Sequence, residues 1–275
     1  MRKSRTRGER KPWGQKTFKF SRNPHLKTIS ASLPSPQTPE PERVRALFDG
    51  LASRYDLFNC LASLGLDQRW RNRLIRSLAE LDLKSGFVLD IGTGTGDLVF
   101  DLLKSSPQSK PSVIGLDISL PMMREARLKI DKSALPVADK AHFVQASSAA
   151  IPLREGSVDA VISAFTMRNV RKFMPETLGE IRRVLKPGGK VFLLEMVAPQ
   201  GGILRVLHRI YLKTVLPAVG ELVFGRNWPR NYLSETIFSF WNPPEFADVL
   251  REFKFQDVRV QSLSGGIAVI HEGTK

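Results

Sequence analysis

The stretch Val88-Leu89-Asp90-Ile91-Gly92-Thr93-Gly94-Thr95-Gly96-Asp97-Leu98 decides the fold of this chain. An apolar run from Phe87 to Ile91 contains one acid near its end and leads into three glycines at alternate positions. This pattern predicts a buried strand at 87–91, a tight turn, and a helix over about 96–105. Because glycine accepts positive φ and lets a ligand approach the backbone closely, we expect the three glycines to line a binding site.

The spacing of this loop differs from that of dinucleotide-binding proteins, which use G-x-G-x-x-G with a pyrophosphate at the helix N-terminus. Here the pattern is D-x-G-x-G-x-G, and the acid is Asp90. A carboxylate repels a pyrophosphate but suits the ammonium of an amino-acid moiety. A second apolar strand, 112–117, ends in Asp117, about 20 residues beyond the last glycine, where an acid can bind ribose hydroxyls. The two motifs together resemble the S-adenosylmethionine site of class I methyltransferases; a Rossmann oxidoreductase and a scaffold without a ligand are the alternatives.

Strands and helices alternate through the body of the chain. Further strands are predicted near 142–145, 158–164 and 190–195. One helix is predicted to begin at Ser119-Leu120-Pro121 and another to span about 175–185. The alternation predicts an α/β fold of the Rossmann-like type, with a mostly parallel sheet and helices on both faces. A turn is predicted at 186–190 and an edge hairpin from 257–261 and 267–271, around Ser264-Gly265-Gly266.

Two helical regions lie outside this alternation. Helical periodicity over 42–82, before the first strand, predicts an N-terminal helical lid, and residues 200–240 form an insertion before the hairpin. The insertion carries an apolar run, 203–224, with cations four residues apart on one helix face: Arg205, Arg209 and Lys213. Such a helix can lie on a membrane surface, or it can be an ordinary surface helix with a solvated basic stripe.

The charge of the chain is uneven. The formal net charge is +15, and residues 1–40 hold ten Lys/Arg against two acids. With its prolines and serines, the segment 1–41 is predicted to be a basic, disordered tail. Contact with RNA or an anionic membrane, a transit peptide for import into an organelle, and a solvated extension remain open for it. We interpret 42–275 as a single domain.

The cysteine count and the lack of long apolar runs indicate the compartment. A single cysteine, Cys60, excludes an internal disulfide and fits a reducing environment. No uncharged apolar run approaches the roughly 18 residues of a transmembrane helix. The four histidines show no metal-ligand spacing, so no metal is expected. We expect a cytoplasmic protein, with peripheral contact at the inner face of the membrane as a further hypothesis.

Distinctive stretches around the core identify a closer resemblance. The segment 44–59 (VRALFDGLASRYDLFN), the element Met167-Arg168-Asn169-Val170 and the segment 182–189 (RRVLKPGG) resemble the UbiE family of menaquinone/ubiquinone biosynthesis C-methyltransferases. Segments 211–220, 232–237 and 265–271 are similar to the same family. The resemblance runs from about 43 to 275, and Lys-Pro-Gly-Gly is its least specific part.

The resemblance implies a set of cofactor contacts. The methionine end of S-adenosylmethionine would be held by Gly92, Gly94, Thr95 and Gly96, together with the acid Asp90. The ribose would lie at Asp117, beside Ile118, and the adenine at Ser147 and Ser148. The family usually has Asp or Asn where Ser147 stands, glycine where Thr166 stands, and aspartate where Cys60 stands. These departures bear on cofactor affinity and, more strongly, on the acceptor side.

The resemblance also implies the acceptor, a quinol ring with a polyprenyl tail that is methylated on a ring carbon. A phenol has a pKa near 10, so a cation or base must favour the phenolate. We assign the electrostatic role to Arg168, ring or water positioning to Asn169, and proton relay to Tyr55 or Asp56. Each assignment has an alternative: Arg168 can pair with a carboxylate, and Tyr55-Asp56 can be a cap and packing pair. His271 is interpreted as a core histidine.

Other functions stay open at this point. A methyltransferase for another lipid or small molecule shares the same core, the charge leaves an RNA methyltransferase as a rival, and a non-catalytic homologue is a third option. Nucleic acid is not an expected partner, because the charge excess is modest outside the tail. A homodimer is among the partners considered. The choice between a demethylmenaquinol and the equivalent benzoquinol is not fixed by the sequence.

Overall fold

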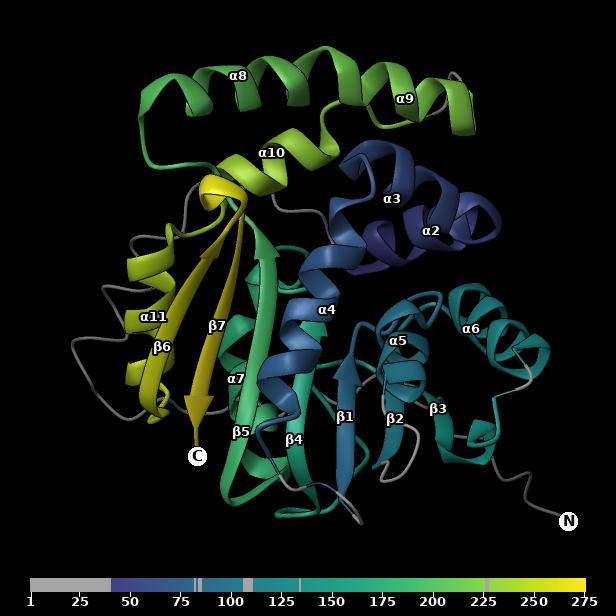
Figure 1. Ribbon diagram of the computed structural model, residues 1–275, viewed down its shortest axis with the longest axis vertical. Coiled ribbons are helices and arrows are strands. Elements are labelled where there is room, and N and C mark those ends of the chain that lie inside the picture. Colours follow the sequence, from purple (N-terminus) through teal and green to yellow (C-terminus); the bar gives the residue numbers. More distant parts are fainter. Residues whose placement is uncertain (1–40, 82, 84–85, 106–110, 134, 226–227) are drawn as a thin grey trace, which may run out of the picture. The chain divides into compact units, whose positions relative to one another are not determined.

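The centre of the molecule is a seven-stranded sheet with the strand order β3-β2-β1-β4-β5-β7-β6 (Figure 1). The strands are β1 (Phe87–Ile91), β2 (Ser112–Asp117), β3 (Ala141–Gln145), β4 (Val158–Ala164), β5 (Leu185–Met196), β6 (Gln256–Leu263) and β7 (Ala268–Thr274). The first five are parallel, and β7 is antiparallel to both β5 and β6. This confirms the predicted α/β sheet with an edge hairpin. The order in which successive strands are added to the sheet reverses between β1 and β4, and ligands bind at such a switch point.

The computed structural model describes residues 41–81, 83, 86–105, 111–133, 135–225 and 228–275. These residues belong to one compact unit. The predicted basic tail lies outside them, except that its last residue, Pro41, begins the first described helix, α2 (Pro41–Leu51). Helix α2 is followed by α3 (Tyr55–Ser63) and α4 (Leu66–Leu78).

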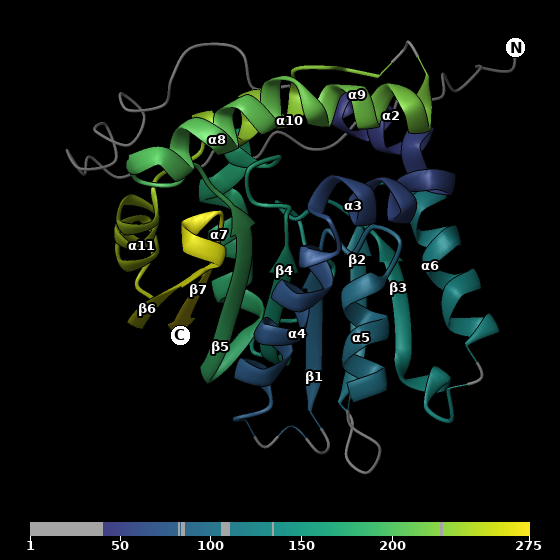
Figure 2. The same cartoon turned by 45° about the horizontal axis from the view of Figure 1, so that its top comes forward.

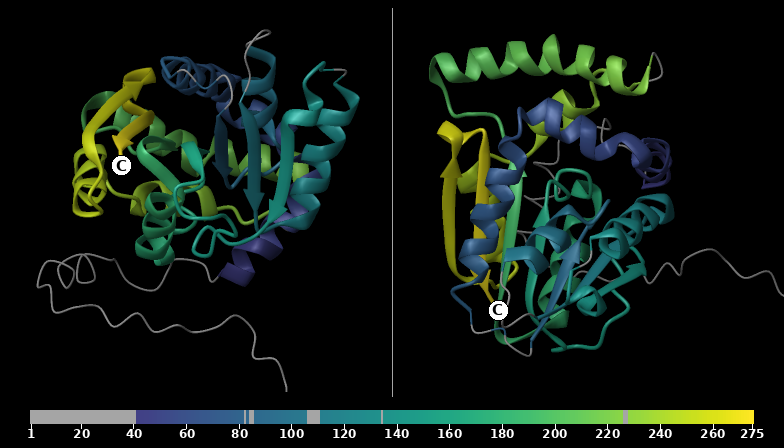
Figure 3. Two further views of the ribbon diagram at one scale, coloured as in Figure 1. Left: turned by 90° about the horizontal axis from the view of Figure 1, so that it is seen from below. Right: turned by 45° about the vertical axis from the view of Figure 1, so that its right-hand side comes forward.

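Two apolar cores cover the two faces of the sheet, because alternate strand residues point in opposite directions. On one face α4, α5 (Asp97–Ser105) and α6 (Leu120–Lys132) pack against Val88 and Ala160. On the other, α7 (Met174–Val184) and α11 (Pro243–Glu252) pack against Leu89 and Val161. Both layers were predicted. Figure 3 shows them in two further views.

A third apolar cluster lies beyond the carboxyl ends of the parallel strands. It joins α2 and α3 to α8 (Gly202–Lys213), α9 (Val215–Phe224) and α10 (Tyr232–Ser239) through Phe58, Leu212 and Trp228. In Figures 1 and 2, α8 and α9 form an outer layer above this end of the sheet. The inserted helices and the N-terminal helices therefore meet over the edge where a ligand is expected.

Three local features differ from the sequence-based expectations or refine them. The apolar run 203–224 is two helices that meet at Thr214, because Pro217 has no N–H to continue the first. The predicted turn 186–190 lies inside β5 as a bulge, with five steps of β5 opposite two of β4 between the pairs Val158–Leu185 and Ala160–Lys190. Helix α11 was not predicted from the sequence, although it begins with a capping box between Asn242 and Glu245.

Candidate functional site

Two pockets lie at the carboxyl edge of the sheet and share part of their walls. The first, called here the cofactor pocket, is lined by the ends of β1, β2 and β4 and by the glycine loop. The second, the acceptor pocket, is lined mostly by apolar side chains of α2, α3, α8 and α10. Four side chains line both pockets: Phe48, Tyr55, Asn59 and Phe165. Two molecules bound in these pockets would therefore meet at these four side chains.

The glycine loop builds the cofactor pocket mainly from backbone. Gly92, Gly94 and Gly96 all have positive φ, which only glycine adopts without strain. The N–H groups of Gly92 and Thr93 both donate to the Leu116 carbonyl, at 2.8 and 3.0 Å. A Cβ at Gly92 would lie 2.2 Å from the Thr166 hydroxyl, so the glycine is required for packing as well. Thr166, the expected departure from the family, thus forms the wall beside the loop.

Asp90 is a buried acid without a full set of partners. Its carboxylate lines the cofactor pocket, is 1 % exposed, and its Oδ2 has no hydrogen-bond partner among the described residues. Burial raises the pKa of Asp90 to about 7. A buried carboxylate with a free oxygen favours a cationic group of a ligand as its partner.

Asp117 is fixed at the end of β2 by the backbone. It accepts hydrogen bonds from the N–H of Gly94 and of Ser119, both at 2.8 Å. Burial raises the pKa of Asp117, and these backbone donors oppose the rise. Asp117 and Ile118 line the cofactor pocket. Since a carboxylate has about four acceptor positions, Asp117 retains capacity for ligand hydroxyls.

The two serines after β3 differ in what their hydroxyls can do. Both line the cofactor pocket. Ser147 accepts from the N–H of Ala149 at 3.2 Å, which leaves its own hydroxyl hydrogen available. Ser148 is buried and shares a 3.0 Å hydrogen bond with Thr177. Of the two, Ser147 has the freer hydroxyl for an adenine.

The residues of this pocket fit S-adenosylmethionine. Asp90 offers a free buried carboxylate oxygen for an ammonium group, the loop offers close backbone approach, and Asp117 offers acceptors for a ribose. Thr95 is the exception among the predicted contacts. Its hydroxyl donates to Asp56 at 2.5 Å, so this side chain can offer a ligand only an acceptor oxygen and its methyl group.

In the acceptor pocket, Arg168 forms a buried ion pair. Its guanidinium and the Glu195 carboxylate are 2.8 Å apart, with side chains 3 % and 0 % exposed. Glu195 also accepts from the N–H of Met167 at 2.5 Å. The Nε of Arg168 has no hydrogen-bond partner among the described residues. Burial raises the pKa of Glu195, and Arg168 opposes this rise. Arg168 therefore pairs with a carboxylate, which was the alternative to its electrostatic role, and it also lines the acceptor pocket.

Tyr55 lines both pockets, whereas Asn169 lines the cofactor pocket and contacts the acceptor pocket through its partner Tyr232. The Tyr232 hydroxyl donates to Asn169 Oδ1 at 2.9 Å, and Asn169 Nδ2 donates to the Phe165 carbonyl at 3.3 Å. Burial raises the pKa of both tyrosines, and Arg168 opposes the rise. Phe165 has a φ of 61°, an uncommon and strained conformation for a bulky residue. Tyr232, Phe165 and Glu195 were missed, although Glu195 ends an apolar strand as Asp117 does.

Asp56 is placed differently from Tyr55. It lines neither pocket. One oxygen accepts from Thr95, and the other lies 2.6 Å from Lys129 Nζ on α6. In the neighbouring helix, Asp49 accepts from the Ser119 hydroxyl at 2.5 Å. These contacts tie α2 and α3 to the cofactor loops, so Asp56 holds the helical lid in this structure.

His271 is a core histidine, as interpreted from the sequence. It is 0 % exposed, bonds through Nε2 to the Pro243 carbonyl at 2.9 Å and packs edge-on against Phe246. Among the described residues, no group of three or more His, Cys, Asp or Glu side chains could hold a metal ion.

Comparisons with known proteins identify the family of the chain. Residues 37–275 match the model of the ubiE/COQ5 methyltransferase family. A ubiquinone/menaquinone biosynthesis C-methyltransferase of Syntrophotalea carbinolica is 38 % identical over 84 % of this chain and 93 % of its own. A demethylmenaquinone methyltransferase of Thermus thermophilus is 37 % identical over 83 % of this chain and 100 % of its own.

Solved structures show the same fold at lower identity. A protein of Methanococcus maripaludis, provisionally described as an S-adenosyl-L-methionine-dependent methyltransferase, has a TM-score of 0.54 and 21 % identity, over 88 % of this chain and 97 % of its own. At this identity the likeness concerns the fold.

Proposed function

We propose that this chain methylates a ring carbon of a reduced polyprenyl quinone, most simply a demethylmenaquinol. The chain belongs to the ubiE/COQ5 methyltransferase family and is an S-adenosylmethionine-dependent methyltransferase. The observation that carries the proposal is the shared wall of the two pockets. A pocket with a free buried acid opens beside a more apolar pocket that holds a buried arginine. This arrangement suits an amino-acid cofactor on one side and an apolar ring on the other.

On the cofactor side, Asp90 would bind the ammonium and Asp117 the ribose, while Gly92, Gly94 and Gly96 let the backbone approach. Ile118, Ser147 and Ser148 would line the adenine end. When bound, S-adenosylmethionine supplies an electrophilic methyl group to the ring carbon, which becomes nucleophilic as the neighbouring hydroxyl loses its proton.

On the acceptor side, Arg168 would stabilise the negative charge that develops on the ring oxygen. Glu195 fixes the arginine in place and leaves its Nε without a protein partner. Asn169, held by Tyr232, would position the ring, and Tyr55 stands where the pockets meet. Asp56 would act indirectly by keeping α3 closed over the site, since its oxygens are engaged by Thr95 and Lys129. Closing the helices excludes water from the reacting groups.

The test uses labelled S-adenosylmethionine and a demethylnaphthoquinone with a short prenyl tail. We expect label on a ring carbon of the reduced acceptor and none when the acceptor is kept oxidised, because the oxidised ring lacks the hydroxyl that activates the carbon. Mass spectrometry locates the methyl group. Label on oxygen or nitrogen would contradict ring-carbon transfer, and transfer to RNA or phospholipid in place of the quinol would favour the rival functions. The parallel assay with a demethylbenzoquinol separates the two ring classes.

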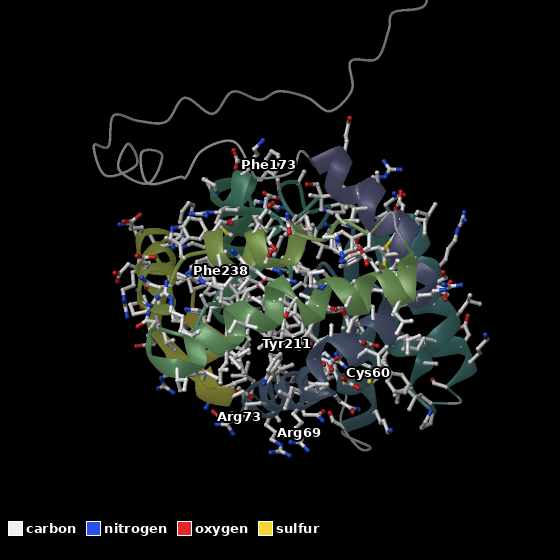
Figure 4. All side chains as sticks on the ribbon, turned by 90° about the horizontal axis from the view of Figure 1, so that it is seen from above. Cys60, Arg69, Arg73, Phe173, Tyr211 and Phe238 are labelled. Carbon is white, nitrogen blue, oxygen red and sulfur yellow. The ribbon has the colours of Figure 1, made fainter. Side chains whose placement is uncertain are left out.

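A second proposal concerns the outer face of α8, which we infer rests on an anionic membrane. Ile203, Val206 and Ile210 are 78 %, 58 % and 53 % exposed, although helix spacing places them on one stripe. The cations Arg205, Arg209 and Lys213 are also exposed on the same helix. Figure 4 views α8 and α9 from above and labels Tyr211, which α8 carries. Apolar residues flanked by cations fit the interface of an anionic bilayer.

The acceptor pocket adds a reason for this location. Leu207 is half exposed and also lines the pocket, so the pocket reaches the same face of the molecule. A polyprenyl tail leaving past Leu207 would enter the bilayer directly. The contact that we propose is peripheral, at the inner face of the membrane. No described helix is long and apolar enough to span a membrane.

Vesicle sedimentation tests the membrane proposal. We expect Ile203→Asp/Ile210→Asp to release the protein from anionic vesicles, with little change in turnover of a water-soluble quinol. Leu128→Asp on α6, an equally exposed apolar position away from this face, is the matched control. If the variant instead converts a dimer to a monomer and keeps vesicle binding, the stripe is a contact between copies, and the membrane proposal is wrong.

A further inference from the structure

His208 is a buried polar side chain without a partner in the wall of the acceptor pocket. It lies on α8, is 6 % exposed, and lines the pocket beside Leu204 and Leu207. Its Nδ1 has no hydrogen-bond partner among the described residues. A polar group buried without a hydrogen bond costs about 1–3 kcal/mol. A bound molecule that offers a partner to the imidazole would remove this cost.

Three other polar side chains of the same pocket are already engaged, whereas Arg168 Nε and Trp228 Nε1 share with His208 the lack of a partner among the described residues. The Tyr211 hydroxyl donates to the Ala62 carbonyl at 2.6 Å, and Tyr232 donates to Asn169. Asp67 is held by Arg71 and by Ser63, both at 2.6 Å. His208 therefore differs from these three engaged groups, because its ring has unmet hydrogen-bonding capacity in a largely apolar wall.

His208 and Arg168 reach the pocket from different layers. Arg168 follows β4 and pairs with Glu195 on β5, so it belongs to the sheet side. His208 belongs to α8, in the layer above the carboxyl ends of the strands (Figures 1 and 2). Burial lowers the pKa of His208, so the ring is neutral at pH 7 and can both donate and accept one hydrogen bond.

We propose that His208 hydrogen-bonds the second ring hydroxyl of the acceptor, the one para to the hydroxyl beside the methylated carbon. This inference rests on the proposed function. In a hydroquinone that carries its tail ortho to the methylated carbon, the second hydroxyl lies next to the tail-bearing carbon. If the first hydroxyl faces Arg168, the second hydroxyl and the tail both point toward α8. The neighbouring residues Leu207 and His208 then serve the tail and the hydroxyl respectively.

The consequence is selectivity for rings with two hydroxyls. A monohydroxy ring of the same shape would leave His208 buried without a partner, whereas a dihydroxy ring pairs it. One neutral hydrogen bond contributes about 0.5–1.5 kcal/mol net, so we expect a preference of roughly 3- to 10-fold to depend on this side chain. His208 acts in this proposal as a specificity residue for binding and does not move a proton.

The experiment measures binding of two ligands to the full chain in the presence of S-adenosylhomocysteine, which has no methyl group to transfer. The ligands are a reduced 1,4-dihydroxynaphthalene with a short prenyl tail and its analogue without the distal hydroxyl. We expect His208→Phe to weaken binding of the dihydroxy ligand by roughly 3- to 10-fold and to leave the analogue nearly unchanged. His208→Gln, which keeps a hydrogen-bonding group, should recover part of the loss.

Each other outcome has a definite meaning. Equal losses for both ligands in His208→Phe would show a packing role and overturn the proposal, and so would unchanged binding of both. A His208→Gln variant no better than His208→Phe would also contradict it. Failure of the wild-type chain to bind either ligand would instead count against the quinol function, so the two failures are distinguishable.

Discussion

The cofactor pocket and the acceptor pocket adjoin, but they are built by different means. In the cofactor pocket, backbone groups do most of the positioning: the Leu116 carbonyl holds the loop, and the N–H groups of Gly94 and Ser119 hold Asp117. In the acceptor pocket, side chains position other side chains: Glu195 holds Arg168, and Tyr232 is itself bonded to Asn169 of the neighbouring pocket. A site made of backbone depends on a short local sequence, whereas a site made of side chains depends on pairs from distant elements.

This difference explains how one fold can serve many acceptors. The glycine loop and the two acids can be retained while the helices above them are exchanged, because few contacts of the loop depend on those helices. The acceptor pocket therefore determines which molecule is methylated, and the fold alone does not specify it. Variants that perturb one pocket should leave the other nearly intact, and the last two of the three predictions below test that independence.

The largest expected effect is electrostatic and concerns Asp90. Its pKa is about 7 in the folded protein and 3.8 as the ordinary value, so the folded protein binds the extra proton between these limits. The contribution of Asp90 to stability therefore falls as the pH rises from about 4 to 7, by roughly 4 kcal/mol in all. Denaturant unfolding of the ligand-free wild type and Asp90→Asn at pH 4 and pH 8 measures it.

The comparison with Asp90→Asn is essential, because burial lowers the pKa of His208 and His271, and their contributions fall in the opposite direction, as pH decreases. Asp248→Asn, at an exposed position of α11, serves as a control. Saturating S-adenosylhomocysteine should reduce the pH dependence by supplying an ammonium partner. Parallel stability curves for wild type and Asp90→Asn would show that burial does not perturb this acid.

The next effect concerns turnover. Arg168→Met alone leaves Glu195 buried and unpaired, which costs about 3–5 kcal/mol, so the paired variant Arg168→Met/Glu195→Gln is the sharper test. We expect turnover to fall by about 100-fold or more, the scale for losing one preorganised donor to a developing oxyanion. Affinity for the cofactor, measured by calorimetry, should stay within a few-fold of wild type. Arg251→Met/Asp248→Asn removes an exposed ion pair as the matched control. A parallel loss of cofactor affinity would mean that the pockets are not independent.

The smallest of the three effects concerns cofactor affinity. Asp117→Ala should weaken binding of S-adenosylmethionine by about 1.5–3 kcal/mol for each lost charged hydrogen bond. Binding of a reduced quinol should change little, because Asp117 does not line the acceptor pocket. Calorimetric titration with each ligand decides the outcome. Equal cofactor affinities for variant and wild type would remove Asp117 from the site.

The same difference governs what could be predicted from the sequence. The strands β1, β2 and β4, the N-cap at Ser119 and the edge hairpin follow from local patterns, and the structure confirms them. The pairing of Glu195 with Arg168 and of Tyr232 with Asn169 could not be predicted, because the partners lie 27 and 63 residues apart and only packing brings them together. The capping box of α11 and the position of Glu195 at the end of β5 are local sequence signals, but neither was among the predictions.

Asp56 shows the limit of assigning a role by resemblance. Its sequence neighbour Tyr55 lines both pockets, whereas the side chain of Asp56 turns to Thr95 and Lys129. Adjacent positions on a helix point about 100° apart, so a motif can place one residue in a site and the next outside it. Tyr55 therefore remains the stronger candidate for proton relay.

The contacts between the N-terminal helices and the cofactor loops also bear on how fast bound molecules leave the site. Asp49 binds Ser119, and Asp56 binds Thr95 and Lys129, so separating α2 and α3 from the core breaks all of these contacts. The same helices line both pockets, so their opening, typically on microsecond to millisecond timescales, would ease the exit of ligands from both. Residence times of the demethylated cofactor and the methylated ring are thereby coupled. Because Asp56 is about half exposed, added salt weakens its ion pair and shortens both residence times together.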